Sequence, residues 1–424
     1  CMTNDIISQY NQLLENLSRE LDISPSKYQK AIQRYIAVKT WLRDGEYEKC
    51  DGEPDIYLQG SFRLGTVVRP IKEGKESDYD IDLVCQLQIA KSSTSPDKIK
   101  SMVGDRLKEN DNYRRMLDEE GRRCWTVNYA EEDGIGFHLD VLPSTPEEAE
   151  FISALIGAGV STEVACQAIA ITHKNQSDDY SWSPSNPNGY ADWFDEVKKP
   201  IFEKIESKER QLLLEKNRDL FTKIDDVPDP LVKTPLQRAI QILKRHRDMR
   251  FVGHELEGDK PISMIVTTLS ARLYQNEEDV YSTLKNIVEK LDAHAGLLRP
   301  GYSLNEGLVS LHLIERKPDG TWYIPNPVNP AENFADRWHE NNHKKARAFF
   351  QWVSWVRSDL LDVLNQADIR RIGKSLEEHF GEKIISKAAS GLYLSAAPAV
   401  LARSRDEVPH VEIRNPSKPW SIYG

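Results

Sequence analysis

The chain has 424 residues, of which 39% are hydrophobic and 29% charged, and its formal net charge is −11. This composition supports a large apolar core and excludes a disordered chain, and the length suggests two or three domains. No apolar run approaches the roughly 20 residues that a membrane-spanning helix needs, so we expect no membrane association, and the negative charge argues against a surface that coats nucleic acid.

Residues 1–46 are predicted to form an N-terminal helical scaffold. Apolar residues recur there at spacings of three and four, which is typical of an amphipathic helix: Ile6, Tyr10, Leu13, Leu14 and Leu17. Ser24 and Pro25 interrupt this pattern before a second helical run.

Four short β-rich runs follow, at residues 56–58, 79–84, 125–129 and 137–142. A helical stretch is predicted at about 97–117, between the second and third runs. Strands mixed with a helix in this way indicate an α/β unit, which we assign to residues 47–220.

Residues 172–193 are polar and rich in Ser, Asn and Pro, and we predict a long loop there. Helical periodicity then dominates to about residue 380, with one break at 326–330, and indicates a helical domain at 221–403. Residues 404–424 contain three prolines and little periodicity, so we predict an extended tail.

Gln59, Gly60 and Ser61 follow the first predicted strand. Glycine lets the backbone approach a ligand closely, and exposed N–H groups beside a serine hydroxyl suit a phosphate. A Gly-Ser turn after a strand is also a common structural feature, so this segment alone does not identify a site.

Asp78, Asp80 and Asp82 alternate along the second predicted strand and would share one face of it. Neighbouring carboxylates repel each other by up to ~1 kcal/mol per pair, and a bound cation offsets this cost. We predict Asp80 and Asp82 as metal ligands because two aliphatic residues follow Asp82. Asp78 with Asp80 is the alternative pair, and a solvated acidic strand end is the structural alternative.

Asp140 lies in the otherwise apolar run 137–143. On a strand beside Asp80 and Asp82 it would be a third carboxylate, as in a two-metal site. The alternative is an aspartate that ends a strand.

Together, Gly60-Ser61, Asp80-Ile81-Asp82 and Asp140 resemble the active-site signature of the DNA polymerase β-like nucleotidyltransferases. Residues 59–66 and 79–84 resemble more narrowly the bacterial CD-NTases, relatives of cyclic GMP–AMP synthase and oligoadenylate synthase that act in CBASS anti-phage signalling. Residues 323–330, followed by Glu332-Asn333, resemble the helical-domain signature of that family. The gap of 19 residues between Ser61 and Asp80 is longer than in many superfamily members.

The resemblance implies an α+β fold, with a polymerase β-like lobe built on a mixed β-sheet and an oligoadenylate-synthase-like helical domain. It implies that three aspartates are catalytic and bind two Mg²⁺ ions, with Mn²⁺ as an alternative: Asp80, Asp82 and Asp140. It implies that five residues bind nucleotide: Gln59, Gly60, Ser61, Lys244 and Ser263. Lys244 and Ser263 correspond to the residues that hold the donor triphosphate.

The function implied is synthesis of a cyclic di- or trinucleotide second messenger from NTPs such as ATP and GTP, with release of pyrophosphate. The product would reach an effector protein by diffusion, in anti-phage defence. One alternative is a nucleotidyltransferase that modifies RNA, a protein or a small molecule. Another is a catalytically inactive nucleotide-binding module. Because the chain lacks a basic stripe and a zinc insert, we expect no obligate nucleic-acid activator.

Three further expectations concern particular segments. Within 172–193, Trp182 and Tyr190 offer stacking faces for a nucleobase, although an aromatic-anchored surface loop fits equally well. Gly424 could serve as a site for ubiquitin-like conjugation machinery, and a plain chain end is the alternative. The five cysteines are scattered without disulfide or zinc spacing, which favours a cytoplasmic location.

Overall fold

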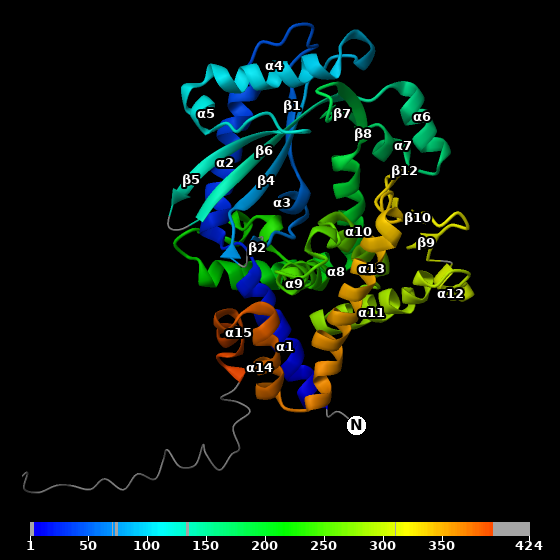
Figure 1. The fold of residues 1–424 in the computed structure, drawn as a ribbon. Helices are drawn as coiled ribbons and strands as arrows, with labels where there is room; N and C mark the ends of the chain where they lie inside the picture. Colours follow the sequence, from blue (N-terminus) through cyan, green and yellow to red (C-terminus); the bar gives the residue numbers. More distant parts are fainter. Residues whose placement is uncertain (1–3, 70, 73–74, 133–134, 310, 393–424) are drawn as a thin grey trace, which may run out of the picture.

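The computed structural model describes residues 4–69, 71–72, 75–132, 135–309 and 311–392. A sheet-containing lobe lies above a helical lobe in Figure 1, which confirms the α+β fold. The predicted tail at 404–424, including Gly424, lies outside the described residues. No helix in the described part of the chain is both long and apolar enough to cross a bilayer.

The central sheet contains six strands within the described residues. They are β1 (Asp55–Gln59), β4 (Tyr79–Gln86), β5 (Trp125–Glu132), β6 (Ile135–Pro146), β7 (Ile169–Lys174) and β8 (Tyr180–Ser185). The order is β1-β4-β6-β7-β8, and β5 also pairs with β6. Of these strand pairs, β4 with β6 is parallel and the others are antiparallel. The four strand runs predicted from the sequence are therefore confirmed as β1, β4, β5 and β6, and the sheet is mixed.

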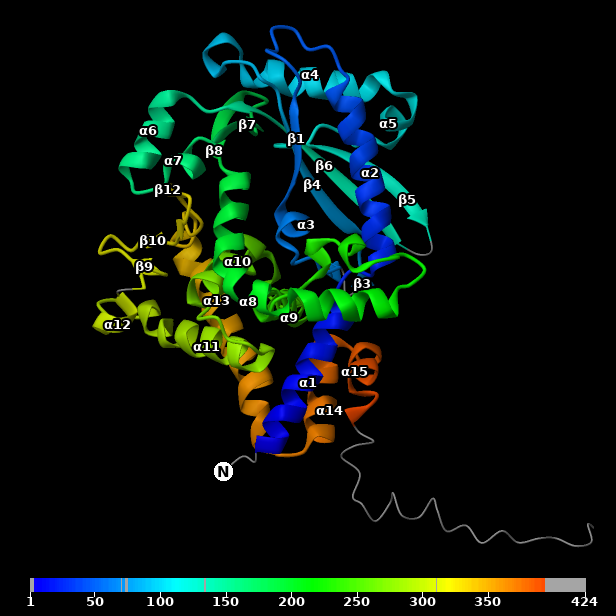
Figure 2. The same cartoon turned by 180° about the vertical axis from the view of Figure 1, so that it is seen from behind.

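One face of the sheet is covered by α2 (Pro25–Arg43) and α4 (Pro96–Glu109), as Figure 2 shows. Ser24 accepts a hydrogen bond from the Lys27 N–H and Pro25 occupies the first turn, so the break in the pattern is the start of α2. Ile81 and Leu83 of β4 lie in the same apolar core as Ile99 of α4. Together, α4 and α5 (Asp111–Met116) confirm the helical stretch at 97–117.

The helical lobe contains α9 (Pro235–Phe251), α10 (Ser263–Leu273), α11 (Val280–Ala293), α13 (Glu340–Val356), α14 (Ile369–Phe380) and α15 (Glu382–Ala389). The smaller elements are α6 (Ala149–Gly157), α7 (Thr162–Ala165), α12 (Glu306–Val309) and the paired strands β2 (Ile71–Lys72) with β3 (Lys75–Glu76), β9 (Glu315–Arg316) with β10 (Trp322–Tyr323), and β11 (Pro325–Asn326) with β12 (Asn329–Asn333).

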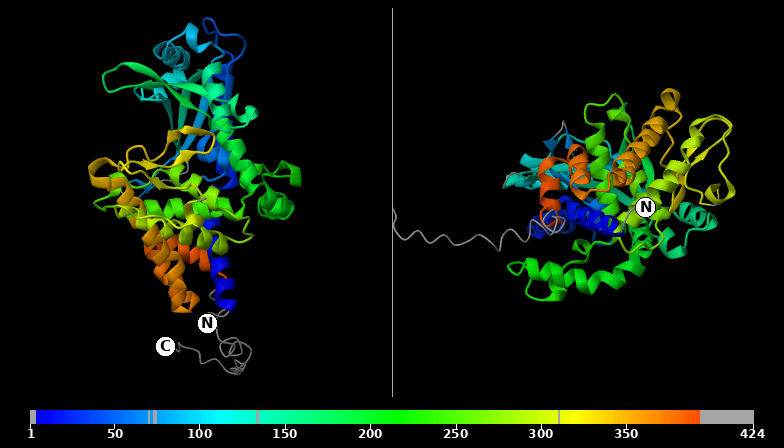
Figure 3. Two further views of the ribbon diagram at one scale, coloured as in Figure 1. Left: turned by 90° about the vertical axis from the view of Figure 1, so that its right-hand side faces the viewer. Right: turned by 90° about the horizontal axis from the view of Figure 1, so that it is seen from below.

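The two N-terminal helices belong to different cores. The stripe of α1 (Asn4–Leu21) packs among α9, α11 and α15, whereas α2 packs on the sheet. Figure 3 shows this separation, with α1 running down beside the helical lobe. The chain therefore passes from one core to the other at the junction of α1 and α2.

The prediction of a long loop at 172–193 is wrong. These residues form the end of β7, a short turn, β8 and the first turns of α8 (Pro187–Lys216). Pro184 is tolerated because β8 is the edge strand of the sheet. Asn186 caps α8 by accepting a hydrogen bond from the Gly189 N–H, and Pro187 starts the helix.

Candidate functional site

Two of the predicted carboxylates are direct neighbours across the parallel strand pair. The register of β4 and β6 places the Cα of Asp82 opposite that of Asp140, and Asp80 opposite His138. Because Ile81 and Leu83 point into the core, alternation directs Asp80 and Asp82 to the opposite face of β4. The strand period of β4 and its register with β6 thus bring three acidic side chains to one edge of a cavity.

Asp78 directly precedes β4 and takes part in a different arrangement. Its Oδ1 accepts a hydrogen bond from the Gly136 N–H at 3.0 Å, and its Oδ2 lies 3.2 Å from His138 Nε2. Asp78 does not line the cavity that contains Asp80, Asp82 and Asp140. Of the two acidic pairs considered from the sequence, the cavity contains Asp80 with Asp82.

The carboxylates repel one another electrostatically. Burial, reinforced by the charges of Asp140 and Asp80, raises the pKa of Asp82 to about 7, while Lys244 acts in the opposite direction. Thr126 Oγ1 donates a hydrogen bond of 2.5 Å to Asp140 Oδ1 and fixes that side chain. Clustered carboxylate oxygens are the ligands that a hard divalent cation prefers.

This donor set fits a divalent cation, although the side chains are not drawn together around one point. Among the described residues, no three His, Cys, Asp or Glu side chains already form a closed metal-binding cluster. Cation binding would therefore bring the carboxylates closer together and offset their repulsion.

The turn after β1 carries the predicted phosphate-binding residues. Gly60 begins α3 (Gly60–Leu64) with φ of 63°, a left-handed conformation that favours glycine. A Cβ at Gly60 would also lie 2.5 Å from Oδ2 of Asp82, so no side chain fits there without displacing the carboxylate. Ser61 lines the cavity, and Gln59 lines an adjoining one.

Helix α9 holds the segment that follows Ser61 with a row of buried polar side chains. Gln237 donates to the Leu64 carbonyl at 2.9 Å, and Gln241 donates to the Val67 carbonyl at 2.9 Å. Lys244 Nζ lies 3.1 Å from the Thr66 carbonyl and 3.0 Å from its hydroxyl. Because these carbonyls are satisfied by side chains of α9, the helical lobe sets the position of the Ser61 turn.

Lys244 and Ser263 line the same cavity as the carboxylates. Burial and the nearby Arg247 lower the pKa of Lys244 to about 7, and Asp248 and Asp82 oppose this effect. Ser263 begins α10 and its hydroxyl lies 3.1 Å from Arg247 Nη1. Ser61, Lys244 and Ser263, which are far apart in the sequence, are thus brought to one cavity.

Sequence reasoning missed Arg247. Its guanidinium is buried, lines the cavity, and contacts Asp248, the Pro261 carbonyl and Ser263. Its spacing of three residues from Lys244 on a helix was an available signal, because residues at that spacing share a helix face.

The two cavities adjoin. The first has a volume of about 340 Å³ and the second about 280 Å³. Four residues line both: Gly60, Leu64, Asp82 and Met264. The second also contains Asn326 and Glu332, whose side chains are joined by a hydrogen bond of 2.7 Å. Burial raises the pKa of Glu332.

The structure does not support stacking by the two aromatic residues considered from the sequence. Tyr190 is buried, its hydroxyl lies 2.7 Å from Thr268 Oγ1, and its ring packs against Trp193. It forms part of the wall of the second cavity, but its ring has no open face for a base. Trp182 packs against the core on the sheet.

A mixed sheet that presents three carboxylates beside a Gly-Ser turn, closed by a helical lobe, defines a nucleotidyltransferase. Residues 54–143 match the family described as "Cyclic GMP-AMP synthase DncV-like, nucleotidyltransferase domain". The whole chain is 25% identical to a c-di-GMP synthase of Roseivirga ehrenbergii, over 99% of that protein. It is 23% identical to the cyclic dinucleotide synthase CdnG of Bradyrhizobium diazoefficiens, covering 94% of this chain and 91% of CdnG.

Solved structures share the fold. The B. diazoefficiens CdnG complex with GTP has a TM-score of 0.63 at 18% identity, over 91% of this chain and 99% of that one. CdnC of Escherichia coli MS115-1 with ATP has a TM-score of 0.56 at 12% identity, over 88% and 98%. These matches confirm the resemblance to the CD-NTases that was drawn from the sequence.

Proposed function

We propose that this CD-NTase joins nucleoside triphosphates into a cyclic nucleotide second messenger and releases pyrophosphate. The observation that carries the proposal is the single cavity lined by Asp80, Asp82 and Asp140 on one side and Ser61, Lys244 and Ser263 on the other. Carboxylate oxygens beside hydroxyl and cationic groups suit a nucleoside triphosphate with its bound metal ions.

The catalytic roles are assigned to Asp80, Asp82 and Asp140, which would hold Mg²⁺ as two ions, with Mn²⁺ as an alternative. Bound cations would neutralise the triphosphate and acidify the attacking ribose hydroxyl. Ser61 binds the donor phosphates, and Gly60 leaves room for the Asp82 carboxylate. Lys244 lines the cavity and uses two of its three N–H donors on Thr66, which leaves the third for the donor phosphates.

The second cavity is the proposed site for a nucleobase, and Glu332 favours guanine. A carboxylate accepts hydrogen bonds from the N–H and NH₂ groups on the edge of guanine, which adenine does not present together. Asn326 holds one oxygen of Glu332 in place. GTP is therefore the preferred substrate, in keeping with the relative that is named c-di-GMP synthase.

The wider role is proposed on the family resemblance: the protein acts in the bacterial cytoplasm, in anti-phage defence, and its product activates a separate effector protein. Ubiquitin-like conjugation at Gly424 stays a prediction.

The test is incubation of the purified protein with each radiolabelled NTP, alone and mixed, with Mg²⁺ or Mn²⁺. Products are treated with phosphatase and identified by chromatography and mass spectrometry. We expect a phosphatase-resistant cyclic product that contains guanine and disappears in the Asp80→Asn/Asp82→Asn variant. A product that persists in that variant, or a nucleotide found only on an added RNA or protein, would refute the proposal.

A further inference from the structure

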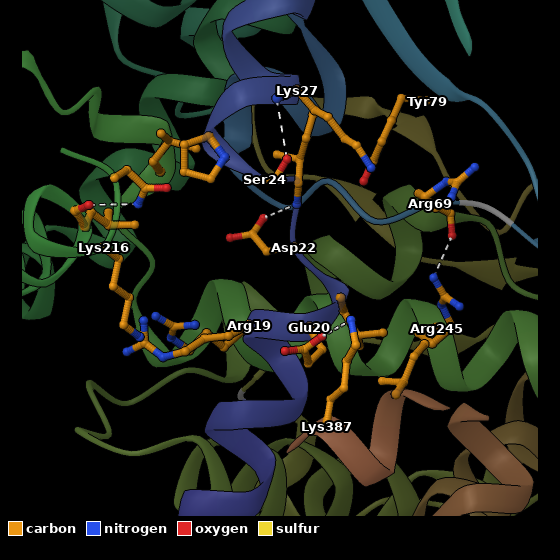
Figure 4. A pocket seen from close by; sticks show the side chains of 18 of the residues that line it. Arg19, Glu20, Asp22, Ser24, Lys27, Arg69, Tyr79, Lys216, Arg245 and Lys387 are labelled. Carbon is orange, nitrogen blue, oxygen red and sulfur yellow. Dashed lines mark hydrogen bonds and ion pairs between the residues drawn. The ribbon is translucent and has the colours of Figure 1, made fainter. Parts of the chain in front are cut away.

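A larger cavity of about 590 Å³ lies where α1, α2, the end of α8, α9 and α15 meet. Figure 4 shows its charged side chains, with Arg19 and Lys216 on one side of the opening and Arg69 and Arg245 on the other. We call it the basic cavity. It shares no lining residue with the two cavities of the candidate active site.

The wall of the basic cavity carries more basic than acidic side chains, in a chain whose net charge is −11. Two of the basic residues, Arg19 and Arg238, share an ion-pair partner, Glu209. Eight of its 19 lining residues are Lys or Arg and two are acidic. The acidic residues already have partners: Glu20 pairs with Lys387 at 3.5 Å, and Asp22 pairs with Lys233 at 3.6 Å. Among the described residues, Lys216 and Lys383 make no ion pair with any acidic side chain.

Like charges gathered around one space repel each other, and an anionic ligand offsets that repulsion. Phosphate groups are the anions that several Lys and Arg side chains can bind at once through charge-assisted hydrogen bonds. The volume lies in the range of small-molecule sites. Apolar side chains such as Ile23, Leu213 and Ile384 provide walls for the organic body of such a ligand.

The basic cavity is connected to the candidate active site through two chain segments. Arg245 Nη2 donates to the Arg69 carbonyl at 3.3 Å, and both residues line the basic cavity. One residue before Arg245, Lys244 binds Thr66, and both of these line the active-site cavity. Residues 66–69 and α9 therefore form part of both walls.

We propose that the basic cavity binds a small molecule carrying several phosphate groups. The bound ligand draws Arg69 and Arg245 together and holds residues 66–69 against α9. This contact stabilises the turn that carries Ser61, so ligand binding raises the rate of nucleotide synthesis. The binding site stands independently of the proposed function, and only the effect on rate rests on it.

The test uses two probes, inorganic tripolyphosphate and inositol hexakisphosphate, with the full-length protein in EDTA. Binding is measured by isothermal titration calorimetry. The variant Lys216→Gln/Lys383→Gln/Lys387→Gln removes three exposed charges from the wall without cutting into a core. The matched control Lys108→Gln/Lys199→Gln/Lys204→Gln removes three exposed helix lysines that lie elsewhere.

We expect one molecule of at least one probe to bind per chain, and its affinity to fall by at least about tenfold in the cavity variant. The control variant binds as the wild type does. Equal binding by the cavity variant would place the probe elsewhere, including the active site, and would overturn the proposal. Failure of both probes to bind would also overturn it. If a 20-base-pair DNA duplex bound more tightly than both probes and lost affinity in the cavity variant, the ligand would be a nucleic acid and the small-molecule proposal would be overturned.

The second readout is pyrophosphate release with GTP and Mg²⁺, at saturating probe and with added Mg²⁺ to compensate for chelation. The rate should rise in the wild type and the control variant and stay constant in the cavity variant. Binding with no change in rate would overturn the coupling. A protein that binds the probe but has no synthetic activity would count against the proposed function and leave the site in place.

Discussion

Gly60 and Asp82 lie so close together that a Cβ atom on Gly60 would be 2.5 Å from Oδ2 of Asp82. Gly60 directly follows β1, whose last residue, Gln59, pairs with Asp82 inside the antiparallel strand β4. The turn proposed to bind phosphate and the central carboxylate of the candidate site are therefore positioned against each other directly.

The Gly60→Ala variant should lose activity because the new methyl group displaces the Asp82 carboxylate. We expect activity to fall by about 100-fold, as for a misplaced catalytic group. The free energy of unfolding should fall by about 1–3 kcal/mol, because alanine is strained at φ of 63°. Pyrophosphate release and urea denaturation measure the two effects.

Gly52→Ala is the matched control for this variant. Gly52 also has a left-handed φ, of 91°, but no heavy atom lies within 4 Å of a Cβ built there. It should lose stability and keep full activity. Equal loss of activity in both variants would contradict the role given to the Gly60–Asp82 contact.

The Asp82→Asn variant should be inactive yet more stable without divalent cations. The neutral amide removes the cost of a buried charge and its repulsion from Asp140 and Asp80, which together raise the pKa of Asp82. We expect activity to fall more than about 100-fold and the free energy of unfolding in EDTA to rise by about 1 kcal/mol. Asp78→Asn should keep activity, because Asp78 binds Gly136 and His138 outside the cavity. An inactive Asp78→Asn protein with normal stability would favour the alternative acidic pair.

Two buried lysines, Lys233 and Lys244, separate a structural role from a role in binding the substrate. Lys233 Nζ lies 3.0 Å from the Gly65 carbonyl, much as Lys244 binds Thr66, but only Lys244 lines the active-site cavity. Both Lys→Met variants should lose about 1–3 kcal/mol of stability, because each leaves a buried carbonyl without its donor. Only Lys244→Met should raise the KM for GTP, by about tenfold or more. Steady-state kinetics would refute this assignment if both variants changed KM equally.

The Glu332→Gln variant tests base selection. An amide presents one acceptor where the carboxylate presents two, so guanine loses one of its two hydrogen bonds. We expect kcat/KM for GTP to fall about tenfold or more relative to that for ATP, with the fold unchanged. Glu315→Gln, an exposed change on β9, is the control. An unchanged ratio of GTP to ATP use would remove Glu332 from the base site.

Acid should destabilise the helical lobe through His246. This buried residue on α9 lies 3.0 Å from Asp359 Oδ2 and also faces His379, Arg250 and Phe380. Burial lowers the pKa of His246 and His379, so the unfolded chain binds more protons than the folded one as the pH falls below about 6.5. The free energy of unfolding then decreases with falling pH, by at most about 1.4 kcal/mol per pH unit for each extra proton.

The pKa of Asp359 is lowered by its contacts with His246, His379 and Arg250 despite the opposing effect of burial. The stabilisation that these contacts give is present above the ordinary carboxyl pKa and is lost as the pH falls. Asp359 therefore also makes the free energy of unfolding decrease with falling pH. Urea denaturation between pH 8 and pH 5 measures the slope. His246→Gln should show a smaller slope than the wild type, and an equal slope would contradict the assignment.

Local periodicity in the sequence was sufficient to predict much of the fold and the acidic part of the site. Alternation along a strand places Asp80 and Asp82 on one face whatever the tertiary structure, and this face lines the cavity. Asp140 could be predicted only as a candidate neighbour, because strand order and register depend on contacts between distant segments. The prediction at 172–193 failed because Ser, Asn and Pro suggest a loop, although Asn186-Pro187 carried the signal for a helix start.

The contributions of the helical lobe were harder to predict. Lys244 and Ser263 were identified through family resemblance, whereas Arg247 and Glu332 reach the cavities only through packing of α9 and β12. The basic cavity joins residues from five segments of the chain, and no local pattern marks such a convergence.

Because α1 packs in the core of the helical lobe and α2 packs on the sheet, each lobe depends on one of the two N-terminal helices. A fragment limited to residues 54–143, the part that matches the family domain, would lack α2 and would expose the apolar face of β4 and β6. A fragment of the helical lobe alone would lack α1 and lose the packing of Tyr10 and its hydroxyl contact with the Leu360 carbonyl. We therefore expect neither lobe to fold without the N-terminal helix that packs in its core.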